Sequence, residues 1–132
     1  MRRIVLDASA ILVLFRDTRG AETVQQFIVS ALQGEAQLFM SVINWGEVYY
    51  ATWRGHGKPV AEILLTRVSR LPIEIEDATW DATKQAAEFK VKYALPYADC
   101  FVASLAHRIE GEIVTSDSDF SAIKNQIPIT FL

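Results

Sequence analysis

The stretch IVTSDSDF, residues 113–120, places a short apolar run directly before two aspartates, Asp117 and Asp119. The run begins with two β-branched residues and ends at Thr115, which is typical of a buried strand. Both aspartates then lie just beyond its carboxyl end. An apolar strand that leads into paired carboxylates raises the question of whether acids from other parts of the chain converge on the same place.

Strands and helices alternate on both sides of this stretch. Short apolar runs predict strands at 3–6, 37–40, 71–77, 112–115 and 127–132. Apolar residues at helical spacing predict helices at 22–33, 41–54, 60–68, 82–93 and 96–109, with a further helix directly after the first strand. Strands separated by helices imply βαβ units, so the sequence predicts an α/β fold with a mostly parallel sheet between two helical layers, a three-layer α/β/α sandwich.

The boundaries carry ordinary start and stop signals. Ser41 is placed to cap the helix at 41–54, and Pro96 to open the helix that follows it. Gly34 and Gly111 are placed to end helices, and the GHGKP segment at 55–59 interrupts the helical pattern.

Composition limits the class of protein. The 132 residues, 51% of them hydrophobic, suit a single domain spanning 1–132, and the formal net charge of −3 excludes a strongly basic nucleic-acid binder. The single cysteine, Cys100, cannot form an internal disulfide and fits a reducing compartment. No stretch approaches the roughly 18 to 20 apolar residues that span a bilayer, and Asp7 interrupts the apolar run near the N-terminus. We therefore expect a cytoplasmic protein with no membrane segment.

Four acids from separate predicted elements point to one edge of the sheet. Asp7 follows the first strand, and Asp117 follows the fourth. Glu47 lies about two turns into the helix after the second strand, and Asp99 lies in the first turn of the helix that Pro96 opens. In open parallel sheets, ligands bind beyond the carboxyl ends of the strands, at the switch in strand order. The sequence predicts that these four carboxylates share that position.

Such a cluster requires a partner. Glu47 has the apolar helical neighbours Ile43 and Ala51, where an unpaired charge is costly. At ~5 Å and an effective dielectric constant of ~20, two like charges repel by ~3 kcal/mol. A divalent cation removes this conflict, and a set of carboxylate oxygens suits Mg²⁺ or Mn²⁺.

Each acid also has a purely structural explanation. Asp7 would cap the next helix, Asp99 would complement a helix dipole, and Asp117 or Asp119 would be an ordinary turn aspartate. Glu47 would pair with a buried arginine or lysine. All of these explanations would have to hold together, which favours the shared site.

Three stretches of the chain resemble the PIN-domain family, and specifically the VapC-type toxins of prokaryotic toxin–antitoxin pairs. They are IVLDASAIL (4–12), SVINWGEVYYA (41–51) and LPYADCFVASLAHRIEGEIVTSDSDF (95–120). The resemblance extends over nearly the whole chain, and the four acid motifs are in register.

The resemblance assigns roles to particular residues. The acids Asp7, Glu47, Asp99 and Asp117 match the acidic quartet of the family. Asp119 matches a further acid that often lies beside it. Ser9 and Thr115 match hydroxyl positions that support the first and fourth acids.

The activity that the resemblance implies is metal-dependent cleavage of RNA by an endoribonuclease. The carboxylates would hold one or two Mg²⁺ or Mn²⁺ ions, and a water made more acidic by the metal would attack the phosphodiester. Asp7, Asp99 and Asp117 are the first candidates for metal ligands, with Glu47 binding a second ion or orienting the water. The family also implies a VapB-type antitoxin as partner, and a homodimer.

RNA contact would depend on local basic groups. When the four quartet acids are set aside, 13 lysines and arginines face 12 acids, so the rest of the chain is close to neutral. The loop RGHGK at 54–58, with Arg54 and Lys58, and the nearby Arg16 and Arg19 are the candidate RNA-binding residues. The alternative is an ordinary solvated loop.

Four aromatic residues surround the helix at 41–54: Trp45, Tyr49, Tyr50 and Trp53. One side of the helix must pack on the sheet, so the other aromatic side chains need a second cover. A homodimer or an antitoxin segment would supply it. The alternative is a helix that is buried between its neighbours in the same chain.

Rival functions make different demands on the sequence. A receiver-type phosphotransfer domain would need paired acids at the first strand and a lysine on a late strand, and IPITFL at 127–132 contains no lysine. A phosphohydrolase would need a second acid two residues after the nucleophilic aspartate, where Asp7 is followed by Ser9. A non-catalytic module on the same fold, binding RNA or protein, would not need every acid.

Overall fold

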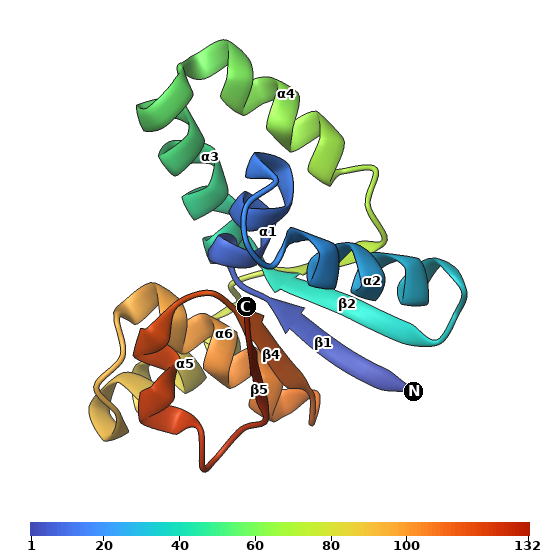
Figure 1. Cartoon of the computed structure of the whole chain (residues 1–132). Helices are drawn as coiled ribbons and strands as arrows, with labels where there is room; N and C mark the ends of the chain where they lie inside the picture. The colour runs from blue at the N-terminus through green and yellow to red at the C-terminus, as the bar shows by residue number, and fades with distance from the viewer.

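The computed structural model describes residues 1–132 and contains one sheet of five strands, all of them parallel (Figure 1). The strands are β1 (Arg2–Leu6), β2 (Ala36–Ser41), β3 (Ile73–Glu76), β4 (Glu112–Thr115) and β5 (Ile129–Phe131). Their order across the sheet is β3-β2-β1-β4-β5. The predicted parallel sheet is confirmed.

Helices cover both faces of this sheet (Figure 1). They are α1 (Ala8–Arg16), α2 (Ala21–Leu32), α3 (Val42–His56), α4 (Lys58–Val68), α5 (Trp80–Lys92) and α6 (Tyr97–Arg108), with the 3₁₀ helix η1 (Ser118–Ile123). The first four helices pack on one face, and α5, α6 and η1 pack on the other. The predicted three-layer α/β/α sandwich is therefore confirmed.

The central strand β1 shows how the sequence builds two cores. Ile4 and Leu6 point to the core formed with α1 to α4, and Val5 points to the core formed with α5 and α6. All three side chains are fully buried. Successive side chains of a strand face opposite sides of a sheet, so a strand covered on both faces reads as a continuous apolar run.

Helices α3 and α4 form a hairpin that extends beyond the edge of the sheet (Figure 1). Ser41 begins α3 as predicted, since its hydroxyl accepts a hydrogen bond of 3.2 Å from the Ile43 amide. The predicted break at 55–59 is reduced to Gly57, which has a φ of 90° and lies between the two helices. None of the helices combines the length and the apolar character needed to cross a bilayer.

The strand order places the switch point between β1 and β4. From β1 the chain adds β2 and β3 on one side, and then crosses to add β4 and β5 on the other. Leu6 pairs with Val114, so the carboxyl ends of β1 and β4 lie side by side. Asp7 and Asp117 follow these two ends, which is the arrangement that the sequence predicts.

The end of α6 differs from the prediction. We expected Gly111 to end this helix through its freedom in φ, but Glu110 adopts the left-handed conformation, with a φ of 54°. Gly111 is required for another reason, because a Cβ built on it would lie 2.6 Å from the backbone oxygen of Arg3 in β1. The residue is a close-approach glycine between two neighbouring strands.

We predict that Gly111→Ala destabilises the protein, because the backbone of β1 cannot move away as a flexible side chain would. The expected loss is about 2 kcal/mol in the free energy of unfolding, measured by urea denaturation. Gly55→Ala is the matched control, since a Cβ there meets nothing within 4 Å, and it should stabilise α3 by about 0.5–1 kcal/mol. Equal stability of Gly111→Ala and the wild type would contradict this account of the glycine.

Candidate active site

Asp7 is the centre of a hydrogen-bond network that joins β1 to β4. Its Oδ1 accepts hydrogen bonds from the Ser9 hydroxyl (2.7 Å) and the Ala10 amide (3.0 Å), and its Oδ2 accepts one from the Thr115 hydroxyl (2.6 Å). The predicted capping role of Asp7 is thus present, because the Ala10 bond caps α1. Ser9 and Thr115 support the first acid directly, as the resemblance implied.

The same hydroxyls hold the loop after β4. The Thr115 hydroxyl accepts a hydrogen bond of 2.9 Å from the Asp117 amide, and the Ser9 hydroxyl accepts one of 2.9 Å from the Ser116 amide. Asp117 Oδ1 in turn accepts a bond of 2.9 Å from the Asp119 amide and caps η1. Asp117 is therefore also a turn aspartate, and this turn directs Asp119 to the same place.

Asp99 enters from the other layer. It lies in the first turn of α6 and is 7% exposed, and its Oδ2 is buried without a hydrogen-bond partner. A buried carboxylate oxygen without a donor costs free energy unless a cation or water satisfies it. This unpartnered oxygen is the first structural sign that Asp99 faces a ligand site.

Glu47 has a partner that the sequence analysis missed. Its Oε1 accepts a hydrogen bond of 2.8 Å from the amide nitrogen of Asn44, which also donates to the Ala98 carbonyl at 3.3 Å. The expected alternative, a buried arginine or lysine beside Glu47, is absent. The spacing of three residues on α3 was the available signal for Asn44, because residues i and i+3 are neighbours on a helix.

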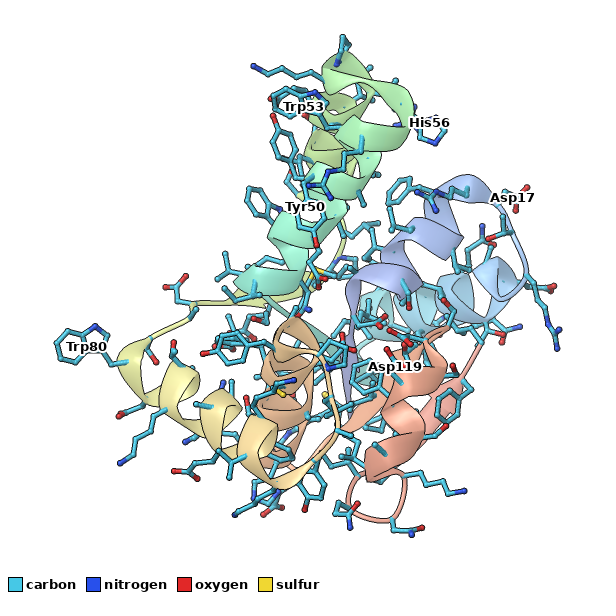
Figure 2. All side chains as sticks on the ribbon, turned by 90° about the vertical axis from the view of Figure 1, so that its left-hand side faces the viewer. Asp17, Tyr50, Trp53, His56, Trp80 and Asp119 are labelled. Atoms are coloured by element: carbon cyan, nitrogen blue, oxygen red, sulfur yellow. The ribbon has the colours of Figure 1, made fainter.

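Three carboxylates come within sharing distance of one ion. One oxygen from each of Asp99, Asp117 and Asp119 lies within 4.8 Å of the others. Asp7 and Glu47 are not members of this group, although both act electrostatically on Asp99. Figure 2 shows Asp119 near the middle of the view, below the hairpin that carries Tyr50 and Trp53.

Burial and mutual repulsion perturb the titration of the site. Burial, followed by the charges of Asp117, Asp7, Glu47 and Asp119, raises the pKa of Asp99 to about 7. Burial also raises the pKa of Asp7, against the opposing effect of the hydrogen bonds that its carboxylate accepts. The other four acids therefore lie within electrostatic range of Asp99.

None of these acids is neutralised by a basic side chain. The chain contains one ion pair, between Arg2 and Glu112 at 2.6 Å. It lies at the amino ends of β1 and β4, away from the carboxyl ends that carry the acids. The negative charge of the site is therefore not compensated by the protein itself. A divalent cation with oxygen ligands fits both this donor set and the unpartnered Asp99 oxygen.

The predicted RNA-binding residues do not form one patch. Arg54 lies over the Tyr50 ring at 5.0 Å and Lys58 over the Trp53 ring at 5.3 Å, on the α3–α4 hairpin. Arg16 instead lines a groove between α1 and the hairpin, together with His56. Figure 2 shows Trp53 and His56 on different sides of the hairpin, both far from Asp119. Arg19 is exposed in the turn between α1 and α2.

Comparison with known protein families gives a match over residues 4–126 to the PIN domain. The chain belongs to the PIN domain family. The PIN resemblance of the sequence motifs is thereby confirmed, and the matched segment contains all five acids of the site.

Solved structures share the PIN fold of this chain at low sequence identity. VapBC2 from Rickettsia felis, solved with a DNA fragment from its promoter, has a TM-score of 0.76 and 17% identity, with 98% of each chain covered. DNA-bound VapBC from Salmonella typhimurium has a TM-score of 0.73 and 18% identity, covering 99% of this chain and 98% of that one.

A third similar structure is VapC20 from Mycobacterium tuberculosis, described as a toxin that cleaves the sarcin–ricin loop. Its TM-score is 0.70 at 19% identity, covering 90% of this chain and 93% of that one. No curated protein sequence matches the chain at a significant level. These three structures share the fold of this chain.

We predict that the metal-free protein loses stability as the pH rises from about 4 to about 7. The folded pKa of Asp99, about 7, lies above its ordinary value of 3.8, so in this window the folded chain retains a proton that the unfolded chain has released. Deprotonation therefore favours unfolding. Asp99→Asn cannot ionise, and at pH 8 it should be more stable than the wild type by on the order of 2 kcal/mol, after allowance for solvent screening.

The measurement is urea denaturation of both proteins in EDTA at pH 5 and pH 8. The quantity that decides is the difference between the two pH dependences, because groups outside the acid cluster titrate equally in both proteins. Identical pH dependence in wild type and Asp99→Asn would show that Asp99 is not the perturbed group.

Proposed function

We propose that the chain, residues 1–132, is one PIN nuclease domain that hydrolyses RNA phosphodiesters with Mg²⁺ or Mn²⁺, and that it acts as the toxin of a toxin–antitoxin pair. The observation that carries the proposal is the group formed by Asp99, Asp117 and Asp119, whose oxygens lie within 4.8 Å of one another without a basic partner. The toxin role follows the VapC20 and VapBC structures that share the fold. Its RNA substrate would place it in the cytoplasm.

The residues divide into ligands and supports. Asp99, Asp117 and Asp119 would hold the cation, which when bound lowers the pKa of a water molecule and offsets charge on phosphate oxygens. Glu47 borders this group and would contact the cation directly or through the attacking water, which it would orient. Asp7 adds negative charge, but its oxygens already accept three hydrogen bonds, so we assign it to holding the site together.

This chain has a groove whose chemistry suits binding of an antitoxin. The groove lies between α1 and the α3–α4 hairpin, has a volume of about 610 Å³, and is lined by apolar residues that include Leu12, Phe15 and Ile63. Arg16 and Arg67 also line it. We propose that an apolar segment of a VapB-type antitoxin, with acidic side chains toward these arginines, occupies it.

The alternative functions lack support of this kind. A receiver-type phosphotransfer domain would require a lysine on a late strand, and the last strand, β5, contains none. A non-catalytic RNA- or protein-binding module remains the competing proposal, and it differs from a nuclease in a direct way. A binding module would retain RNA without cleaving it when Mn²⁺ is supplied.

We predict that the protein cleaves labelled RNA internally in Mn²⁺ or Mg²⁺, and that excess EDTA abolishes the cleavage. Asp99→Asn and Asp119→Asn should each lower the rate by about 100-fold or more, because a lost ligand removes several kcal/mol of charge stabilisation. Glu88→Gln, an exposed position on α5, is the control that should keep activity, and the inactive aspartate variants, purified in the same way, exclude a contaminating nuclease. Wild-type activity in a folded Asp99→Asn protein, or cleavage that survives EDTA, would contradict the proposal.

We also propose that the exposed aromatic face of α3 is covered in a homodimer. Tyr50 is 47% and Trp53 44% exposed, whereas Trp45 packs partly into the core. Only part of the aromatic set is thus covered within the chain.

We predict that light scattering at micromolar concentration gives twice the chain mass of 14.8 kDa. Trp53→Glu should shift the mass toward the monomer, since burying an unpaired carboxylate is unfavourable. Val91→Glu is the control, because Val91 is an apolar residue of α5 that is 88% exposed. A wild-type protein that is monomeric at this concentration would refute the dimer.

A further inference from the structure

Asn44 is a buried amide that contacts two parts of the candidate site. It lies in the first turn of α3 and is 0% exposed. Its amide nitrogen donates to Glu47 Oε1 at 2.8 Å and to the Ala98 carbonyl at 3.3 Å. Both partners are acceptors, so only the nitrogen end of the amide can face them, and its two N–H groups are both used.

The second contact crosses between helices. Ala98 directly precedes Asp99 in the first turn of α6, and it is separated from Asn44 by 54 residues of sequence. One side chain therefore connects the Glu47 carboxylate on α3 to the turn that carries Asp99. The distance between these two acids is set in part by this amide.

This arrangement is unfavourable for folding alone. The Asn44 Oδ1 atom is buried without a hydrogen-bond partner, and asparagine is a weaker helix former than an apolar residue such as leucine. The amide also holds a carboxylate close to another carboxylate, which adds repulsion. A residue that lowers the stability of the fold and lies in a ligand site is best explained by a role in ligand binding.

We propose that Asn44 is a positioning residue of the metal site, because its two-pronged amide keeps the Glu47 carboxylate beside the Asp99 turn. The inference rests on the proposed function. Glu47 Oε1 is engaged by Asn44, and no protein donor binds Oε2. This second oxygen is the one available to a divalent cation or to a water molecule in the site.

The expected consequence of losing the amide is a weaker metal site. Without Asn44, the Glu47 side chain is free to rotate away from the other carboxylates, which relieves repulsion in the metal-free protein. Binding an ion would then have to draw it back. Groups that orient metal ligands typically change metal affinity by about 10–100-fold when they are removed, and we expect a change of that size.

The test is a double-mutant cycle on Mn²⁺ affinity, with free Mn²⁺ measured by electron paramagnetic resonance. Asn44→Ala and Glu47→Gln should each weaken binding by about 10–100-fold, and the double variant should be no weaker than Glu47→Gln alone. Raising the Mn²⁺ concentration should restore RNA cleavage in Asn44→Ala, which still has Glu47, but not in Glu47→Gln. Asn125→Ala, an exposed residue after η1, is the matched control and should bind as the wild type does.

Stability separates positioning from a merely structural role. Asn44→Leu removes both the donor and the unpartnered oxygen, so its melting temperature should equal or exceed that of the wild type while its Mn²⁺ affinity falls as in Asn44→Ala. This variant carries the test if Asn44→Ala does not fold.

Two results would overturn the inference while leaving the nuclease proposal intact. One is wild-type Mn²⁺ affinity in a folded Asn44 variant. The other is a double variant whose loss equals the product of the two single losses, since Asn44 would then act independently of Glu47. A wild-type protein that neither binds Mn²⁺ nor cleaves RNA would remove the proposed function, and this inference with it.

Discussion

The structure is constrained by repulsion between carboxylates that lie together at one edge of the sheet. The strand order brings the carboxyl ends of β1 and β4 together, and it places Asp7 and Asp117 there with Asp99 above them. No lysine or arginine pairs with these acids. At short range such charges repel by a few kcal/mol per pair, roughly half the stability of a marginally stable domain. The fold therefore tolerates a local cost that only a cation or protonation can remove.

The hydrogen bonds around the site stabilise some of these carboxylates more than others. Asp7 is stabilised in its charged form by Ser9, Ala10 and Thr115, and these contacts also join the two central strands. Asp99 has no such support on its Oδ2, and burial and the neighbouring acids raise its pKa to about 7. Burial raises the pKa of Asp7 as well, but the hydrogen bonds that its carboxylate accepts oppose that rise. One buried acid thus serves the framework and another remains available, although the sequence presents them as equivalent. The difference lies in which donors each carboxylate meets after folding.

The helical layers, the parallel sheet and the converging acids could be predicted from the sequence, because each follows from local apolar periodicity or from the position of a strand end. Sequence reasoning did not reach Asn44, whose partners are a helical neighbour and a carbonyl on another helix, a contact set by packing between α3 and α6. It grouped Arg16 with Lys58 because both are basic. In the structure, Arg16 lines the groove between α1 and the hairpin, whereas Lys58 lies over the Trp53 ring. Gly111 was assigned to the correct boundary for the wrong reason, since closeness to β1 cannot be read from one strand alone.

The presence of every acid argues for catalysis over simple binding. A module that only bound RNA would gain affinity from removing negative charge near the phosphate backbone, and one substitution at Asp119, which is exposed, would do so without disturbing the core. In this chain Asp119 lies beside Asp99 and Asp117, and the Asn44 amide donates a hydrogen bond to Glu47. Concentrated negative charge repels the polyanion unless a cation lies between them. The same acids that oppose RNA binding in the metal-free protein are those that a metal-dependent nuclease requires.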